Sequence, residues 1–125
     1  MLSGLAASCG VVYLLSPLAQ PSVPAESVRA VQDLRLVAAV ELAWAAGGAP
    51  FAPPDRLKAA GYLDPKWPRS DPRAYRLTCE VEAARAFTCF ADSLSASRAH
   101  FRIDAAQTVR FERGRRPDGR SPIYP

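Results

Sequence analysis

Two cysteines, Cys79 and Cys89, have the residue type and spacing in this chain that most directly suggest chemistry. A structural zinc site usually needs four ligands at recognisable spacing, and the only other candidates are Cys9 and one distant histidine, His100. A redox-active pair is more often a Cys-x-x-Cys motif at the start of a helix. The two cysteines are therefore predicted neither to bind a metal nor to carry out redox catalysis.

The residues around these cysteines alternate between apolar and polar with a period of two, which is typical of strands with one buried face. Pairing Cys79 with Cys89 also aligns the other inward-facing residues and leaves a loop of about five residues, an acceptable hairpin length. The aligned pairs are Leu77 with Ala91 and Val81 with Phe87. This register favours a structural disulfide over two free thiols, and a disulfide predicts an oxidising compartment such as the bacterial periplasm or the cell surface.

No catalytic constellation is recognisable in the sequence. His100 is the only histidine, and it falls on the predicted outward face of a strand. The carboxylates Asp55, Asp64 and Asp71 are scattered through loops beside proline or arginine, which suits turns and caps. We therefore expect no catalytic, cofactor-binding or metal-binding residues, no small-molecule substrate, and no enzyme activity.

The net charge of +4 does not by itself indicate a nucleic-acid partner. Specific binding to nucleic acid needs a clustered basic face with interleaved aromatic residues, and no predicted helix carries one. The clustered arginines near the C-terminal end could bind an acidic neighbour or lipid head groups, but a solvated terminus is the favoured interpretation. These residues are Arg110, Arg113, Arg115, Arg116 and Arg120. No nucleic-acid binding is expected.

A helical period predicts one long helix over about residues 24–46, ended by the glycines at 47 and 48. Its sheet-packing face is predicted to consist of Val28, Val31, Leu34 and Val37, with Asp33 on the opposite side. From Leu36 onward the helix carries a single charge and is expected to be covered nearly all round.

Four short strands follow a proline-rich connector and a second short helix at about 54–60. Period-two alternation places these strands around residues 75–81, 87–91, 101–103 and 109–111. Trp67, in the loop before them, is expected to anchor that loop in the core. The predicted fold class is α+β, a long N-terminal helix packed on a three- or four-stranded antiparallel meander.

Residues 1–24 form a separate region, because the first charged side chain is Glu26. This uncharged, apolar region ends in a proline-rich linker and is interpreted as an N-terminal anchor or a truncated export segment. The stretch LAASC, ending at Cys9, superficially resembles a bacterial lipoprotein cleavage box. Lipidation of Cys9 and its burial as an unmodified thiol both stay open.

The order of elements over about residues 25–125 resembles type IV pilins and type II secretion pseudopilins. Residues 30–52 are similar to the exposed half of a pilin spine helix, and residues 57–65 to the short helix and Gly-Tyr-Leu turn that follow it. Residues 99–124 are similar to the closing strands of pilin-like domains. The prepilin peptidase motif is absent from the printed chain.

This resemblance implies a non-enzymatic subunit at the periplasm or cell surface that acts by packing in a type IV pilus or type II secretion assembly. Its partners would be other pilin-like subunits or secretion-system proteins, with the inner membrane reached through the N-terminal segment. The alternative expectation is a membrane-anchored periplasmic lipoprotein that uses the same domain as a small binding module.

Overall fold

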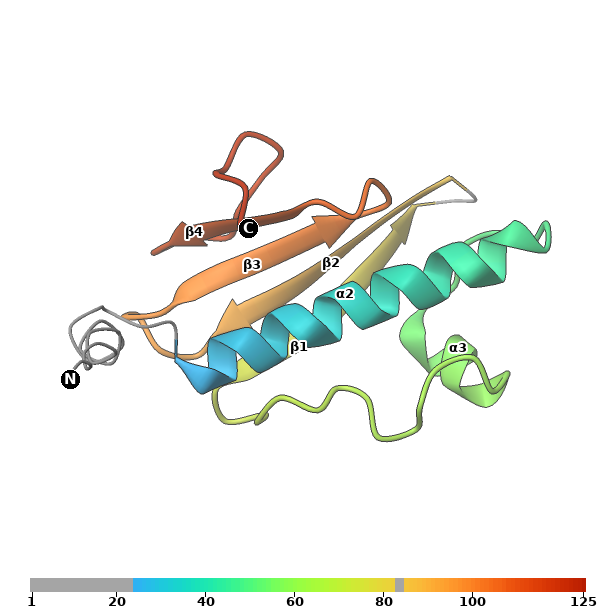
Figure 1. Cartoon of the computed structure of the whole chain (residues 1–125), viewed down its shortest axis with the longest axis horizontal. Helices are drawn as coiled ribbons and strands as arrows, with labels where there is room; N and C mark the ends of the chain where they lie inside the picture. The colour runs from blue at the N-terminus through green and yellow to red at the C-terminus, as the bar shows by residue number, and fades with distance from the viewer. Residues whose placement is uncertain (1–23, 83–84) are drawn as a thin grey trace, which may run out of the picture.

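The computed structural model describes residues 24–82 and 85–125, which form a helix layer packed on a sheet layer (Figure 1). The helices are α2 (Ala25–Ala46) and α3 (Pro54–Ala59). The strands are β1 (Tyr75–Glu82), β2 (Ala86–Ser93), β3 (Ala99–Asp104) and β4 (Val109–Arg113). The strands pair antiparallel in sequence order. The expected α+β domain, a helix on an antiparallel meander, is confirmed.

Helix α2 spans Ala25–Ala46, 22 residues, so the predicted bounds of about 24–46 are confirmed, whereas the description of it as a long N-terminal helix is not. Pro24 precedes it, and the Pro24 carbonyl accepts hydrogen bonds from the amides of Ser27 and Val28. At the other end, Gly48 has a φ of +94°, a left-handed conformation that glycine adopts without steric cost.

α2 runs roughly along the strands, and its buried face contacts β1, β2 and β3 (Figure 1). Val31, Leu34 and Val37 are buried, as expected. Val28 is 39% exposed, so its predicted place on the packing face is wrong. At about 100° per residue Val28 lies roughly 120° round the helix from Leu34, outside the buried arc. Ser27 is buried on this face instead.

Two further expectations for α2 are wrong. Asp33 was placed on the outer side, but it is only 3% exposed because the loop at residues 67–70 covers it. The C-terminal half was expected to be covered all round, but Leu36 is 45% exposed. α2 therefore has one side on the sheet, one side under a loop and one side open.

Trp67 anchors its loop in the core, as predicted. Its side chain is buried, and its indole nitrogen donates to the Asp33 carbonyl oxygen at 3.0 Å. At the other end of α2, the ring of Phe51 packs edge-on against Phe87 of β2, with ring centroids 4.8 Å apart. The two loops thus cover the side of the core that α2 leaves uncovered.

The two edges of the sheet differ. The outer edge of β4 is covered by the C-terminal tail, because the Phe111 amide donates to the Pro122 carbonyl and the Tyr124 amide donates to the Val109 carbonyl. Among the described residues, β1 has a strand partner only on its β2 side. Within residues 24–82 and 85–125, β1 is thus the edge strand whose outer backbone groups have no strand partner.

Candidate functional site

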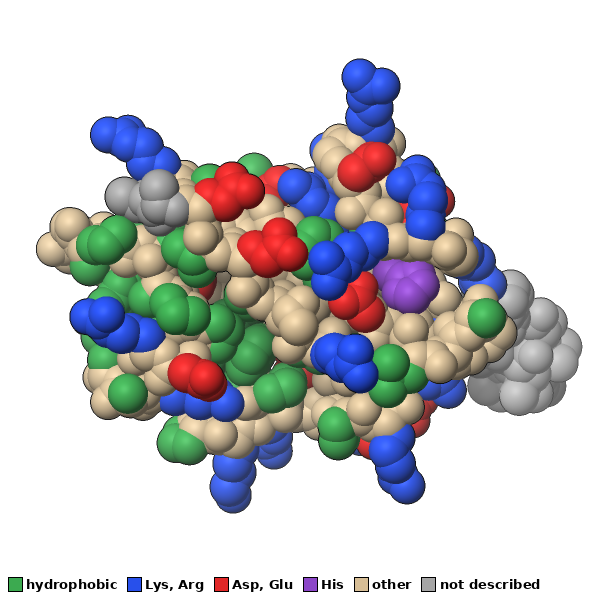
Figure 2. Space-filling view, turned by 180° about the vertical axis from the view of Figure 1, so that it is seen from behind, with side chains coloured by type: hydrophobic (Ala, Val, Ile, Leu, Met, Phe, Trp, Pro, Cys, Tyr) green, Lys and Arg blue, Asp and Glu red, His purple; other side chains and the backbone are tan. Residues whose placement is uncertain are grey.

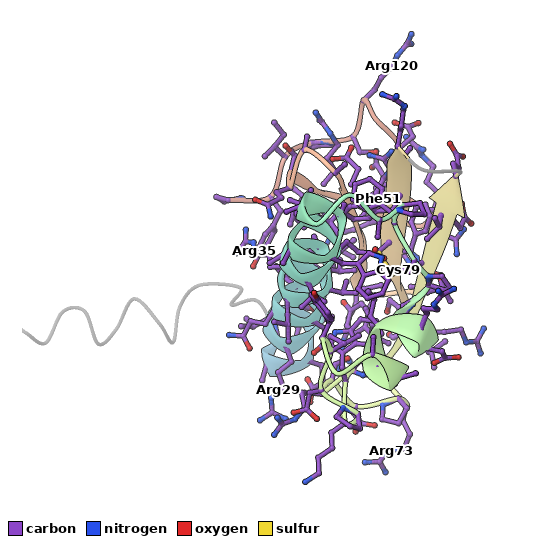
Figure 3. All side chains as sticks on the ribbon, turned by 90° about the vertical axis from the view of Figure 1, so that its right-hand side faces the viewer. Arg29, Arg35, Phe51, Arg73, Cys79 and Arg120 are labelled. Carbon is purple, nitrogen blue, oxygen red and sulfur yellow. A yellow bond between two sulfur atoms is a disulfide. The ribbon has the colours of Figure 1, made fainter. Side chains whose placement is uncertain are left out.

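The two strand cysteines form a disulfide. Cys79 and Cys89 are directly paired across β1 and β2, with their Cα atoms 4.0 Å apart. The predicted register is confirmed in full by the pairs Leu77 with Ala91 and Val81 with Phe87. Cys79 lies on the sheet face toward the helices (Figure 3). The bond links two neighbouring strands and performs no chemistry that the geometry can identify.

The part of the chain that the structure describes contains no cluster of three or more His, Cys, Asp or Glu that could hold a metal ion. His100 lies on the outer face of β3, where its Nδ1 accepts a hydrogen bond from the Ser93 amide at 2.9 Å. Asp64 and Asp71 each accept the amide of a residue two positions later, which is a turn interaction. Each of these groups has a structural role in its own neighbourhood.

The interpretation of the C-terminal arginines as a solvated terminus holds only in part: Arg113, Arg115 and Arg120 are exposed, whereas Arg116 packs on the sheet. Arg116 stacks on the ring of Phe90, with its guanidinium carbon 3.9 Å from the ring centroid. The same guanidinium pairs with Asp92 at 2.8 Å and Glu80 at 3.5 Å. Hydrogen bonding to Asp92 raises the pKa of Arg116, so it stays charged.

Figure 2 shows the side of the sheet that lies away from α2, where basic and acidic side chains are interleaved around the histidine. Arg115 adds two more ion pairs in the tail, to Glu112 at 3.0 Å and Asp118 at 3.4 Å. Because cations and carboxylates alternate, this face has no continuous basic stripe of the kind that binds nucleic acid.

The most specific polar site in the core is one that the sequence analysis missed. The carboxylate of Asp33 accepts the backbone amides of Arg69 and Ser70, each at 2.9 Å. With the Trp67 indole on its carbonyl oxygen, Asp33 holds three groups of the loop. No motif marks this position, because the loop partners are separated from Asp33 by more than thirty residues.

A second buried carboxyl lies near the C-terminal end of α2. Glu41 is fully buried, and its Oε1 accepts the Ala52 amide at 3.0 Å. Its Oε2 has no hydrogen-bond partner among the described residues. Burial raises the pKa of Glu41, and the hydrogen bond from Ala52 opposes this only in part.

This arrangement predicts that Glu41→Gln increases the free energy of unfolding, by an amount that depends on pH. The folded state binds the Glu41 proton more tightly than the unfolded state does. The contribution of the protonated Glu41 to stability is therefore complete below the ordinary carboxyl pKa, and it is lost as the pH rises through the raised pKa. The variant should be more stable than the parent by about 1 kcal/mol at about pH 8, the order of cost of one unsatisfied buried group. The difference should vanish near about pH 4.

Urea unfolding at the two pH values measures the difference. Glu82→Gln is the matched control, because Glu82 is exposed in β1 and its neutralisation should change stability little at either pH. A parent chain at least as stable as Glu41→Gln at the higher pH would show that the buried oxygen has a partner.

A surface site lies along the outward side of α2. Val28 and Leu36 are large apolar side chains exposed by 39% and 45%. The exposed residues between and beyond them on this side are uncharged and mostly small. They are Gln32, Ala39, Ala43 and Ala46. We call these six residues the outer stripe; Arg29 and Arg35 flank it and point away from the sheet (Figure 3).

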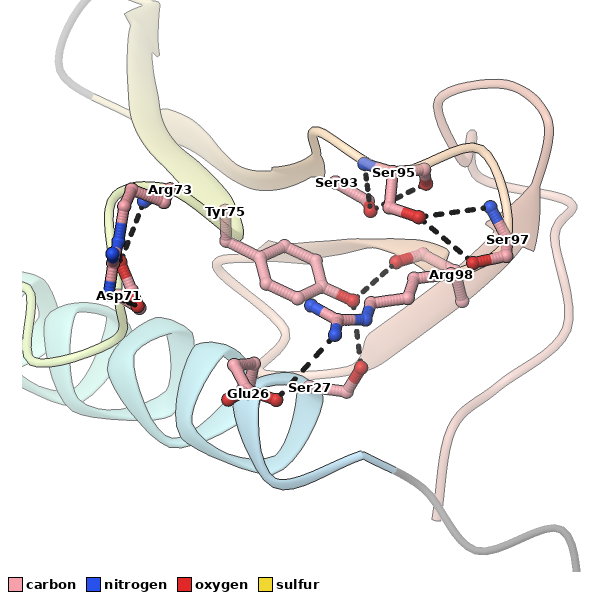
Figure 4. A network of polar contacts seen from close by, with 10 residues as sticks. Glu26, Ser27, Asp71, Arg73, Tyr75, Ser93, Ser95, Ser97 and Arg98 are labelled. Carbon is pink, nitrogen blue, oxygen red and sulfur yellow. Dashed lines mark hydrogen bonds and ion pairs between the residues drawn. The ribbon is translucent and has the colours of Figure 1, made fainter.

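A polar network joins the first turn of α2 to the sheet (Figure 4). The Tyr75 hydroxyl donates to the Ala99 carbonyl at 2.8 Å and shares a hydrogen bond of the same length with the Ser27 hydroxyl. Burial raises the pKa of Tyr75, so the phenol stays neutral and can make both bonds. Beside it, Arg98 lies 3.8 Å from Glu26.

Comparison with protein-family models, curated proteins and solved structures finds no match to this chain. No helix in the described ranges is long and apolar enough to cross a bilayer. Cys9 and residues 1–23 lie outside the described part, so the predictions about lipidation and anchoring stay predictions. Fold and site define a disulfide-bonded α+β domain with an exposed apolar stripe on its helix.

Proposed function

We propose that this chain is a non-enzymatic, pilin-like subunit that acts by packing against other subunits in a type IV pilus or type II secretion assembly. It would be a minor pilin or pseudopilin at the periplasm or cell surface. Its partners would be pilin-like or secretion-system proteins, and the segment before Pro24 would contact the inner membrane.

The outer stripe is the observation that carries this proposal. A helix face that combines exposed Val28 and Leu36 with small alanines lets another helix approach closely and bury apolar area. The stripe itself contains no carboxylate and no arginine, so covering it would not leave a buried charge without a partner. The stripe runs from the first turn of α2 to its last residue, along the element that resembles the pilin spine.

The disulfide supports the proposed compartment. Disulfides between neighbouring strands form and persist in oxidising compartments and are rare in the reducing cytosol. A bond between Cys79 and Cys89 is therefore consistent with an exported domain. Residues 1–25 carry no charged side chain, which is compatible with contact with a membrane.

Replacing one stripe residue tests the proposal. Leu36→Asp should leave the fold intact, because the side chain is already 45% exposed, but should place a charge in the subunit interface. We expect at least about a tenfold loss of the chain from sheared filaments, or from cross-linked complexes with pilin-like subunits, in its native host. The measurement is immunoblotting of those fractions against total protein.

Leu94→Asp is the matched control. Leu94 is 50% exposed in the turn between β2 and β3, away from the stripe, and its variant should be recovered like the parent. Equal recovery of the Leu36 and Leu94 variants would overturn the stripe as a packing surface. Equal melting temperatures of the two purified variants would exclude misfolding as the cause of a loss.

The alternative, a membrane-anchored lipoprotein that serves as a small binding module, is favoured by a separate observation. A cavity of about 410 Å³ lies beside the first turn of α2, a size typical of small-ligand sites. Intact mass of the protein from the native membrane fraction tests the anchor. A chain that begins at Cys9 and carries acyl groups would establish the lipoprotein and exclude the fibre subunit.

A further inference from the structure

The cavity lies where four parts of the fold meet: the first turn of α2, the start of β3, the end of β4 and the C-terminal tail. Its apolar wall is aromatic. Phe111 and Tyr124, which are half-buried, form its accessible part, and the buried ring of Phe101 lies behind them, 5.3 Å between centroids from Tyr124. The Tyr124 centroid lies 6.0 Å from that of Phe111. We call this space the aromatic cavity. Its wall suits an apolar chain or ring better than a sugar or a nucleotide phosphate.

Hydrogen bonds hold the walls of the aromatic cavity in place without a ligand. Tyr75 ties Ser27 of α2 to the carbonyl of Ala99 at the start of β3 (Figure 4). The tail is held by the Tyr124 amide on the Val109 carbonyl, at 2.7 Å. A preformed site avoids much of the ordering cost that binding would otherwise incur.

Two arginines line the same cavity. Arg113 donates to the Ser97 carbonyl at 3.2 Å, and no carboxylate among the described residues lies within ion-pair distance of it. The ion pair of Arg98 is a long one, 3.8 Å to Glu26. Both guanidiniums thus keep unused donors, in contrast to Arg116, which makes two short bonds to Asp92.

We propose that the aromatic cavity binds a single-chain carboxylate amphiphile of the fatty-acid type. The carboxylate accepts hydrogen bonds from Arg98 and Arg113, and its alkyl chain lies on Phe111 and Tyr124, backed by the buried ring of Phe101. Arginine matches a carboxylate because its planar fork can donate two parallel hydrogen bonds. The proposal does not depend on subunit packing, because the outer stripe and the cavity share no residue.

Titration of the full chain with octanoate, followed by backbone amide NMR, tests the site. We expect saturable shifts confined to residues 97–101, 111–113 and 124. Across hexanoate, octanoate and decanoate, the Kd should fall about three- to fourfold per methylene, the increment for burying a CH₂ group. Shifts only in residues 1–23, or no saturable shifts, would overturn the proposal.

A double variant, Arg98→Gln with Arg113→Gln, isolates the carboxylate contribution. It should weaken octanoate binding at least about tenfold, the effect of removing a charged hydrogen-bond pair, and leave 1-octanol binding unchanged. Arg115→Gln with Arg120→Gln is the control for net charge, because neither residue lines the cavity. Equal loss in both double variants would mean that only general electrostatic attraction acts, and no loss in either would exclude the arginines as ligands.

Phospholipid carries the same apolar chain with a different head group, and a parallel titration separates the two sources. Short-chain phosphatidylglycerol below its micelle concentration should bind more weakly than decanoate, because two chains and a bulky head exceed a cavity of about 410 Å³. Tighter binding of the phospholipid would overturn the assignment to a free carboxylate.

Discussion

Asp33→Ala should lower the free energy of unfolding by about 3 kcal/mol, the largest effect we expect from any single polar substitution in this domain. The carboxylate accepts the amides of Arg69 and Ser70, and each hydrogen bond to a charged acceptor contributes about 1.5–3 kcal/mol. Ser70 is buried, so its amide would lose its partner without gaining water. Urea unfolding of parent and variant at neutral pH measures the difference.

Two further variants separate this account from a general loss of charge. Asp55→Ala removes an exposed carboxylate of α3 and should change stability by no more than about 0.5 kcal/mol. Asp33→Asn keeps the shape but offers one acceptor where two amides need one each, so it should still lose about 1–2 kcal/mol. An Asp33→Ala variant within the range of the Asp55 control would show that the loop does not depend on this carboxylate.

Removing the disulfide should cost about 2–3 kcal/mol under oxidising conditions, the entropy of closing so short a loop in the unfolded chain. The change is Cys79→Ala with Cys89→Ala, which avoids leaving one cysteine free to pair with Cys9. For a domain of about 100 residues this corresponds to a fall in Tm of roughly 10–20 °C. Differential scanning calorimetry with and without reductant is the measurement.

Reductant provides the internal control. It should lower the Tm of the parent toward that of the double variant and leave the double variant unchanged. If the double variant lies as far below the parent in Tm with reductant as without it, the effect comes from lost packing of the fully buried Cys89 side chain and not from the covalent bond.

The sequence alone was sufficient for the parts of this fold that depend on local pattern. The register of β1 and β2, with its disulfide, followed from a period of two combined with a short loop. A one-residue slip would have turned every inward residue to the solvent, so the alternation is compatible with few strand registers. The bounds of α2 followed in the same way from Pro24 and the two glycines at its end.

The resemblance to pilin-like proteins stays a proposal, because it depends on the order of elements and on soft motifs. Element order constrains the architecture, and the structure shows a helix on a four-stranded antiparallel meander. Function, however, resides in particular surfaces. The outer stripe and the aromatic cavity are the two surfaces on which the proposals now depend.

Only the tertiary structure decided which side of each element is covered. Asp33 was assigned to the wrong side of α2, because helical periodicity does not reveal that a loop folds over one flank. Val28 was assigned to the packing face although it lies at the margin of the arc that the sheet covers. Arg116 was interpreted as solvated, although Phe90 and Asp92 bind it from a strand more than twenty residues away. The sequence by itself determined the elements and their register, since these depend on neighbours along the chain. Long-range packing decided the buried polar sites and the cavity, since their partners meet only in the fold.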